Sequence, residues 1–272
     1  MRIDAHQHFW TPSTQTWLDE SMSVLKRDFW PEHLEPLLRE QGFDGCIAVQ
    51  TLASVDETRL YLKLAGEHDF ITGVVGWVDL CSSDARADIV RLSSDPKLVG
   101  IRHIAQSEPD DFLVRPDFQR GIAALGEIGL VYDILIYARQ LPAALQLVRA
   151  FPRQRFVVDH IAKPEIKAGI KQPWEERMRE MARHPNVACK LSGMVTEADW
   201  NRWKPSDIAF YLDTVLDCFG PSRLMIGSDW PVCLLAGSYE RVVGMLFDYI
   251  SRLSTGEQDA ILGMTAQAVY RV

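Results

Sequence analysis

The chain opens with Arg2-Ile3-Asp4-Ala5-His6-Gln7-His8-Phe9-Trp10, and this stretch carries the first evidence on both fold and function. Two histidines, separated by one residue, end a short run that reads as a β-strand. Alternation along a strand would send His6 and His8 to the same side. Two neutral imidazoles side by side provide half of a transition-metal site. The alternative is two ordinary polar residues near the amino terminus.

Seven further runs of the same kind follow, and helix-like segments separate them. Most of the runs are apolar without clean alternation, as expected for parallel strands that are covered on both faces. The eight expected strands are Ile3–His8, Gly45–Thr51, Ile71–Val78, Val99–Ile104, Leu130–Ile136, Phe156–Ile161, Val187–Leu191 and Leu224–Ser228. This alternation of strand and helix predicts an α/β protein.

The lengths of the connections distinguish between the possible α/β folds. Links from a helix into the next strand look short, as at Gln41–Phe43, whereas links from a strand into the next helix are often long, as at Phe9–Pro31 and Ser192–Pro205. In a (β/α)8 barrel the long strand-to-helix loops build the active-site face. We therefore predict a single (β/α)8 TIM barrel over 1–272, with its active site at the C-terminal ends of the strands. An open doubly wound sheet is the alternative, but no GxGxxG turn supports it.

The composition excludes several classes of protein. Hydrophobic residues make up 47% of the 272 and charged residues 24%, which indicates a soluble globular chain. The formal net charge of -8 argues against a nucleic-acid partner or an anionic membrane surface. No signal peptide and no membrane helix are expected. The five cysteines form no CxxC pair and are expected to be reduced thiols, which predicts a cytoplasmic protein.

Polar groups end nearly every expected strand, where an apolar core would otherwise continue. Burying such groups costs several kcal/mol unless they pair or bind something. Because strand ends converge in a closed barrel, one catalytic site would account for all of them. The groups are His6 and His8, Arg102 and His103, Asp133 and Tyr137, Asp159 and His160, Lys190 and Ser192, and Ser228 and Asp229. Asp4, Asp133 and Asp159 could either orient these groups or serve the structure.

An ordered set of motifs resembles the amidohydrolase superfamily over the whole chain. Its branch of lactonases, which open L-fuconolactone, L-rhamnono-lactone or 2-pyrone-4,6-dicarboxylate, is the most similar. The motifs are the early His-x-His, Gly100-Ile101-Arg102-His103, Asp159-His160-Ile161-Ala162-Lys163-Pro164 and Gly227-Ser228-Asp229-Trp230-Pro231. The His-x-His is weak evidence by itself, whereas the ordered set is strong evidence.

The resemblance implies roles for the residues at the strand ends. His6 and His8 would be metal ligands, His160 a third ligand or a substrate contact, and Asp229 both a ligand and the general base. Elementary chemistry agrees, because three such donors leave an open position on Zn²⁺, where a water reaches a pKa of about 7.

Attack of that water on a lactone carbonyl creates an oxyanion, which needs a positive partner. Arg102, Lys190 and the metal itself are the candidates, and His103 could protonate the leaving ring oxygen.

The chain departs from the wider superfamily in ways that limit the metal content. No lysine ends the fourth or fifth expected strand, so a carboxylated-lysine bridge and a binuclear site are not expected. Lys190 lies where many relatives place another histidine. We therefore expect one divalent metal, most simply Zn²⁺. The alternative is a metal-free site, as in the pyrone lactonase, in which His6, His8 and His160 hydrogen-bond the lactone carbonyl.

Aromatic residues and cations indicate the kind of substrate. Trp30 belongs to a group of aromatic residues in the first long loop that either form a ring-stacking wall for a sugar or pack among themselves. Tyr137, near the end of the fifth strand, is a second substrate-binding candidate. Only Arg102 stands out as a carboxylate clamp, and a dicarboxylate would prefer two cations. A neutral sugar lactone therefore fits better.

Three functions remain open at this stage. The first is hydrolysis of an aldono-1,4- or 1,5-lactone as the small-molecule substrate. The second is a metal-dependent decarboxylase, or another amidohydrolase-type hydrolase, on the same fold. The third is a non-catalytic barrel that binds a sugar or a metal. The oligomeric state cannot be predicted from the sequence.

Overall fold

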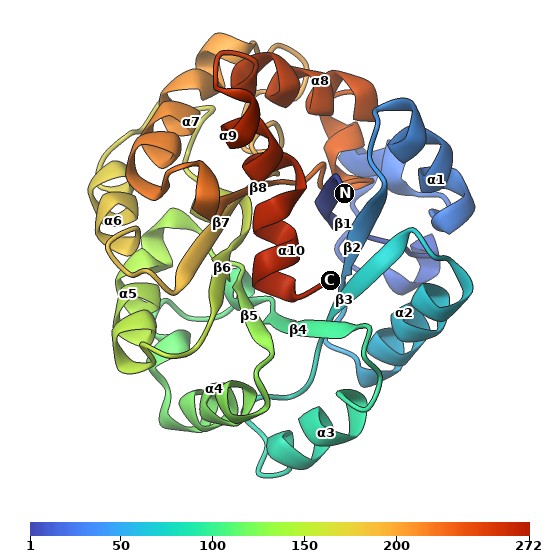
Figure 1. Ribbon diagram of the computed structural model, residues 1–272, viewed down its shortest axis with the longest axis vertical. Helices are drawn as coiled ribbons and strands as arrows, with labels where there is room; N and C mark the ends of the chain where they lie inside the picture. Colours follow the sequence, from blue (N-terminus) through green and yellow to red (C-terminus); the bar gives the residue numbers. More distant parts are fainter.

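Eight parallel strands form the centre of the protein, which is described over residues 1–272 by a computed structural model. The strands follow one another in chain order around a nearly closed barrel, as Figure 1 shows. They are β1 (Ile3–Gln7), β2 (Gly45–Val49), β3 (Ile71–Gly76), β4 (Leu98–His103), β5 (Val131–Ile134), β6 (Phe156–Val158), β7 (Val187–Leu191) and β8 (Leu224–Ile226). The predicted (β/α)8 barrel is confirmed.

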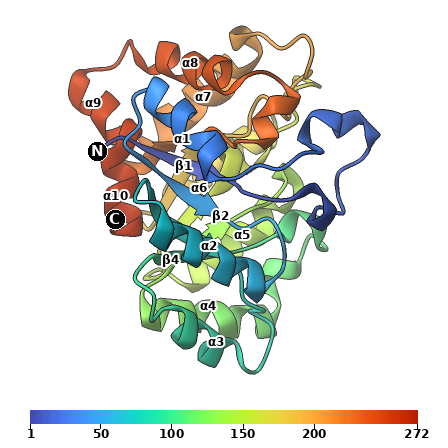
Figure 2. The same ribbon diagram turned by 90° about the vertical axis from the view of Figure 1, so that its right-hand side faces the viewer.

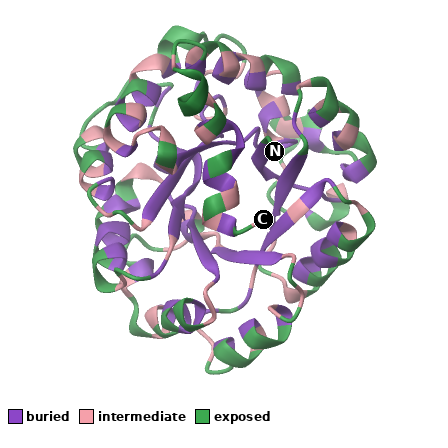
Figure 3. Cartoon of the chain, in the orientation of Figure 1, coloured by how far each residue is buried: buried purple, intermediate pink, exposed green.

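Helices surround the barrel and bury its outer face. Their buried faces lie against the strands and their exposed faces are turned to solvent, as Figure 3 shows. The helices are α1 (Pro31–Glu40), α2 (Val55–Glu67), α3 (Ala85–Leu92), α4 (Pro116–Ile128), α5 (Leu141–Ala150), α6 (Trp174–Met181), α7 (Pro205–Phe219), α8 (Tyr239–Ile250), α9 (Thr255–Asp259) and α10 (Thr265–Tyr270). No helix is both long and apolar enough to span a membrane.

The closure between β1 and β8 is made by backbone hydrogen bonds beyond the end of β8. Asp229 N donates to His6 O over 2.8 Å, and His8 N donates to Trp230 O over 2.7 Å. The buried Asp4 carboxylate accepts from Ser228 N at 2.9 Å. The same few contacts therefore close the barrel and bring the first and last polar motifs together.

The interior of the barrel is filled in layers. Every strand and α10 contribute to a buried apolar cluster of Ile3, Ala5, Ile47, Val49, Val75, Val99, Val131, Val157, Ala188, Met225, Ala266 and Tyr270. Two residues further along β5, β6 and β7, alternation places Asp133, Asp159 and Lys190 in a polar layer. All three side chains are fully buried.

Helix α10 covers the N-terminal end of the barrel. Figure 2 shows α10 and both termini at one end of the molecule, with the long β1–α1 connection at the other. Tyr270 reaches into the interior, where its hydroxyl lies 2.9 and 2.8 Å from the two carboxylate oxygens of Asp133. The C-terminal helix is therefore connected directly to the polar layer.

The strand starts agree with the sequence prediction to within one residue, whereas five predicted strands run two or three residues too far. The strands predicted to reach Thr51, Val78, Ile136, Ile161 and Ser228 end at Val49, Gly76, Ile134, Val158 and Ile226. At β6 the cause is a left-handed turn that begins after Asp159. All five cysteines are free thiols, and three of them, Cys46, Cys189 and Cys233, are buried.

The contact between Tyr270 and Asp133 gives a stability prediction. Tyr270→Phe should lower the free energy of unfolding by about 1.5–3 kcal/mol, because it removes a buried hydrogen bond to a charged group. The matched control is Tyr249→Phe, since Tyr249 donates to Asp213 on the surface over 2.8 Å. That variant should change stability by only about 0.5 kcal/mol. Urea denaturation measures both, and equal losses would contradict the prediction.

Candidate active site

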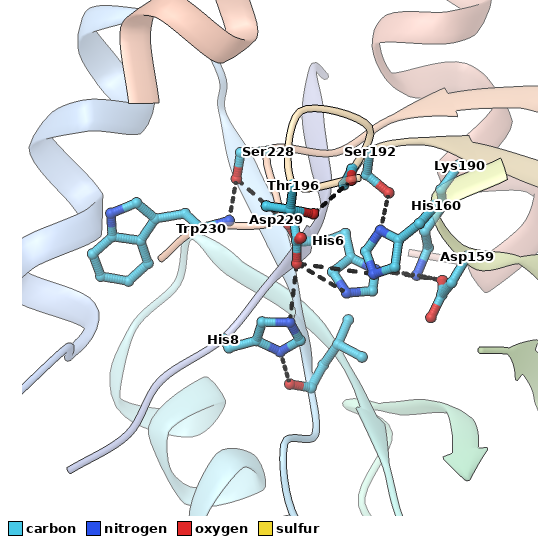
Figure 4. A network of polar contacts seen from close by, with 12 residues as sticks. His6, His8, Asp159, His160, Lys190, Ser192, Thr196, Ser228, Asp229 and Trp230 are labelled. Atoms are coloured by element: carbon cyan, nitrogen blue, oxygen red, sulfur yellow. Dashed lines mark hydrogen bonds and ion pairs between the residues drawn. The ribbon is translucent and has the colours of Figure 1, made fainter. Parts of the chain in front are cut away.

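Three imidazoles converge on one carboxylate at the C-terminal end of the barrel. The Nε2 atoms of His6, His8 and His160 lie 3.8, 3.4 and 3.9 Å from Asp229 Oδ1. Figure 4 shows all three rings directed at this oxygen. All four side chains are buried. The structure thus brings together the four residues predicted to bind a metal.

The first strand places its two histidines through an irregularity in its pairing. The register of β1 against β2 shifts between Asp4 and Gln7. This irregularity allows Ala5 and His6, which are adjacent in sequence, both to face the barrel interior. His8 then follows on the same side, and its Nδ1 lies 2.6 Å from the backbone oxygen of Val49. Nδ1 must donate to that oxygen, which fixes the ring so that Nε2 faces Asp229.

His160 lies in a left-handed turn that the sequence did not predict. Four consecutive non-glycine residues, His160, Ile161, Ala162 and Lys163, have φ values of 53, 48, 58 and 44°. This conformation costs roughly 1–2 kcal/mol per residue. Trp174 Nε1 stabilises the turn by donating to Ile161 O over 2.7 Å. The turn directs both His160 and Lys163 toward the cavity.

Two neighbours fix the orientation of the His160 ring. Its Nδ1 lies 2.8 Å from Ser192 Oγ, which leaves Nε2 to face Asp229. Gly193 follows Ser192 with φ +62°, and a Cβ atom at that position would lie 2.5 Å from Nδ1 of His160. The glycine is therefore required both by its backbone conformation and by the close approach of the imidazole.

Asp229 is held by the turn after β8. Its own φ is 60°, and its backbone is fixed by the closure of the barrel. Ser228 Oγ accepts a hydrogen bond from Trp230 N at 3.0 Å. The Asp4 side chain is buried on the outer face of the barrel wall, where it accepts from Ser228 N and from the hydroxyl of Tyr239 at 3.0 Å. Asp4 also accepts from His6 N at 3.2 Å, so it fixes the backbone of both the turn and the first histidine.

Lys190 lies beneath His6 in the polar layer and does not line the cavity next to Asp229. Its ammonium is 2.6 Å from Asp133 Oδ2, 3.0 Å from Asp159 Oδ1 and 3.2 Å from His6 Nδ1. Its side chain is fully buried, so a substrate cannot reach it. Lys190 therefore orients His6 and neutralises two aspartates. It cannot contact an oxyanion that forms on a substrate in the cavity.

Arg102 lies between the polar layer and the cavity. One guanidinium nitrogen is 3.0 Å from Asp159 Oδ2 and 3.2 Å from His6 Nε2, and the other donates to the backbone oxygen of Gln50. Because Arg102 and His103 are adjacent on β4, alternation turns one inward and the other outward.

Burial determines the charges of these groups. It lowers the pKa of His6 well below its usual value and that of His160 to about 4, so both rings are neutral near pH 7. Burial opposes ionisation of Asp229, but the surrounding histidines outweigh it and hold its pKa below the usual range. The site therefore presents an ionised carboxylate next to the uncharged imidazoles of His6 and His160.

A cavity of about 420 Å³ opens above Asp229. Its walls are part polar and part apolar, and they come from several strand-to-helix loops. The lining residues are His8, Trp17, Met22, Thr51, Arg102, Ile104, Gln106, Ser107, Leu135, Tyr137, His160, Lys163, Asp229 and Val232. Tyr137 and Arg102, two of the predicted substrate contacts, are among them.

Two predicted site residues lie away from this cavity. His103 is directed outward, with its Nε2 3.0 Å from Glu108 and its ring stacked on Phe112 at 4.7 Å. Trp30 is half-buried, immediately before α1, and packs against the core. Trp17, from the same aromatic loop, lines the cavity in its place.

Sequence reasoning missed several lining residues. Met22 lies in a short 3-10 helix after β1, and Gln106 and Ser107 lie in another after β4; no sequence pattern marks them as site residues. Lys163 belongs to the motif Asp159–Pro164 and follows His160 by three residues, but the motif alone indicates no role for it.

The donor set fits one divalent metal of the zinc type. In a tetrahedral zinc site with bonds of roughly 2.0–2.1 Å, neighbouring donors lie roughly 3.4 Å apart. The measured distances of 3.4–3.9 Å from Asp229 Oδ1 approach this value. His6 Nε2 has one lone pair, so it would hold either the metal or the hydrogen bond from Arg102.

A (β/α)8 barrel with His-x-His on its first strand and an aspartate after its last defines the class of this protein. The chain belongs to the amidohydrolase family, whose model matches residues 3–272. An L-fucono-1,5-lactonase from Burkholderia ambifaria is 44% identical over 276 residues, which cover 98% of this chain and 91% of that protein.

Two crystal forms of an amidohydrolase from Burkholderia multivorans have the same fold. One, with bound HEPES, has a TM-score of 0.95 at 41% identity, and the other, with bound zinc, has a TM-score of 0.92 at 40% identity. Each alignment covers 100% of this chain and 99% of the other.

The close approach of Gly193 to His160 gives a prediction about the site. Gly193→Ala should displace the imidazole and weaken zinc binding by at least about tenfold, as loss of a ligand's orientation does elsewhere. The matched control is Gly220→Ala, which also has positive φ but has no other atom within 4 Å of the added Cβ. Crystal structures and calorimetric zinc titrations of both variants test this. An unmoved His160 in Gly193→Ala would contradict it.

Proposed function

We propose that this protein hydrolyses a sugar lactone, an aldono-1,4- or 1,5-lactone. The observation that carries the proposal is the ionised Asp229 carboxylate, which three imidazoles surround at the base of a cavity large enough for one sugar ring. The 44% identity to an L-fucono-1,5-lactonase supports the same substrate class.

Asp229 is the general base in this proposal. A water within reach of Oδ1 would give its proton to the carboxylate while its oxygen attacks the lactone carbonyl carbon. The fixed position of Asp229, held by the closure of the barrel, directs the attack. The Nε2 atoms of His6, His8 and His160 surround Asp229 Oδ1, so they would position the attacking water next to that oxygen.

The positive charge near the carbonyl oxygen comes from Arg102. Its guanidinium lines the cavity and stays protonated, so it would stabilise the negative charge that develops on the carbonyl oxygen. Lys190 supports this arrangement from below, because it holds Asp159 and His6 in place.

One divalent metal, most simply Zn²⁺, would be held by His6, His8, His160 and Asp229. When bound, it would lower the pKa of a water and polarise the carbonyl. The zinc in the Burkholderia multivorans structure supports this. In the metal-free alternative, the contact between Arg102 and His6 would remain and the imidazoles would bind the lactone directly.

The cavity walls favour a neutral ring. Trp17, Met22 and Val232 provide an apolar side, whereas Gln106 and Ser107 provide hydrogen-bonding groups. A sugar lactone has an apolar ring face and hydroxylated edges, which such walls accommodate. The free thiols of all five cysteines support a reducing compartment such as the cytoplasm.

A pH-indicator assay against a panel of sugar lactones tests the function. Acid release above the spontaneous rate is expected for the zinc-loaded protein, and chelation of the metal should abolish most of it. Unchanged activity after complete removal of metal would select the metal-free alternative. Release of carbon dioxide from a carboxylated substrate, with no lactone opened, would instead support a decarboxylase.

Asp229→Asn should keep the fold and lose about 10²–10⁴-fold in kcat, because the amide cannot accept the proton. The matched control is Asp213→Asn, which removes a carboxylate that pairs with Arg252 on the surface. Circular dichroism checks the fold, and the lactone assay measures the rate. Activity of Asp229→Asn close to that of the unmodified protein would rule out this mechanism.

A further inference from the structure

The indole of Trp17 is exposed at the cavity. Trp17 lies in the long β1–α1 connection and lines the cavity, yet its side chain is 40% exposed. It meets the buried ring of Trp10 edge to face, with the two ring centroids 5.8 Å apart. Because a tryptophan presents a large apolar area to water, a ligand that covers this indole gains binding free energy.

A hydrogen bond anchors the indole through its only polar group. Trp17 Nε1 donates to Gln15 Oε1 over 2.8 Å, and Gln15 is only 4% exposed. An indole nitrogen can only donate, so the oxygen of the Gln15 carboxamide must face Trp17 and its nitrogen must face away. The orientation of the carboxamide is therefore fixed.

The other end of this carboxamide continues a chain of hydrogen bonds into the protein. Gln15 Nε2 donates to Thr51 Oγ1 and to Thr14 Oγ1, both over 3.0 Å. Since the Thr51 hydroxyl accepts from Gln15, it donates its own proton to the carboxylate of Glu57. Glu57 also accepts from the backbone N–H groups of Thr51 and Leu52, each over 2.8 Å. All donors in the chain thus point from Trp17 toward one buried carboxylate, and such hydrogen bonds strengthen one another.

The chain of hydrogen bonds connects separate segments of the fold at the cavity. Gln15 belongs to the β1–α1 connection, Thr51 follows β2, and Glu57 lies in the first turn of α2. Thr51 lines the same cavity as Trp17. The position of the indole is therefore set by α2 and not by its own connection alone. A ring that is already held in place loses little freedom when a ligand covers it, so more of the contact appears as affinity.

We propose that Trp17 binds the sugar lactone by stacking its ring on the apolar face of the substrate, and that Gln15 is the positioning residue of Trp17; this inference rests on the proposed lactonase function. The hydroxyl groups of a sugar project mainly from the edges of its ring, so an indole covers one face without burying unpaired hydroxyls. Trp17 carries no group that exchanges protons with a lactone. Its contribution is therefore to binding and not to bond cleavage.

Kinetics of two tryptophan variants test the stacking. Trp17→Leu keeps an apolar side chain but removes the ring face. For the sugar lactone that is opened fastest in the panel, KM should rise about tenfold, while kcat changes less than about threefold. The matched control is Trp200→Leu. Trp200 is also partly exposed and anchored, since its Nε1 donates to Thr196 O over 2.8 Å, but it does not line the cavity. This control should leave KM unchanged.

A double-mutant cycle tests the role of Gln15. Gln15→Met keeps the length of the side chain but cannot hold the indole, so KM should rise about threefold. Adding Gln15→Met to Trp17→Leu should raise KM no further, because Gln15 acts only through the ring. The matched control is Gln154→Met. Gln154 is also 4% exposed and donates two hydrogen bonds, but it does not line the cavity, so its loss should leave KM unchanged.

Tryptophan fluorescence measures the stacking without turnover. The probe is the lactam of the same sugar, or L-fucono-1,5-lactam if no lactone is opened, because its amide resists hydrolysis. The lactam should shift the emission of the unmodified protein and of Trp200→Leu. The shift should be lost in Trp17→Leu, whereas a merely structural role of Trp17 would leave it in place.

The outcomes separate this inference from the proposed function. If the unmodified protein opens no lactone, the lactonase function fails, but an emission shift that requires Trp17 still supports the stacking. The stacking is overturned if KM of Trp17→Leu stays within about threefold of the unmodified value, or if this variant keeps the full emission shift. If the effects of Gln15→Met and Trp17→Leu on KM multiply, Gln15 does not act through the ring and its positioning role is overturned.

Discussion

The backbone contact between His6 and Asp229 is the interaction on which the rest of the site depends. Asp229 N donates to His6 O, so one hydrogen bond closes the barrel and brings the base against the first imidazole. A barrel can accept this bond only if all eight strands keep their order and tilt. The site is therefore a property of the whole barrel, and no single loop could assemble it.

A second constraint is charge balance in the interior. Lys190 and Arg102 are buried with Asp133 and Asp159, and no member of this group could be removed without leaving an unpaired charge, which costs several kcal/mol. The group contacts His6 from below and so fixes the ring that faces Asp229. Its rigidity comes from the same ion pairs that compensate the cost of burying it.

Elementary periodicity predicted much of this arrangement. Strand ends that converge in a barrel brought His6, His8, His160 and Asp229 together, because parallel strands share one C-terminal edge. Alternation also explains the failure at His103, since adjacent residues on one strand face opposite sides. The left-handed turn at Lys163 was not predictable, because no glycine marks it and tertiary contacts outweigh the local preference. Trp17 and Trp30 belong to the same loop, and only the path of the loop backbone decides that Trp17, and not Trp30, lines the cavity.

The connection between the C-terminal helix and the polar layer has a consequence for biosynthesis. Tyr270 contacts Asp133, and the partner of Asp4 lies 224 residues away along the chain. A ribosome releases a chain from its amino end, so the strand that carries both early histidines emerges long before the residues that enclose it. Until the final helix is free of the exit tunnel, the buried carboxylate of Asp133 lacks its hydrogen bond from Tyr270. Nascent chains of this protein should therefore depend on chaperones until synthesis ends.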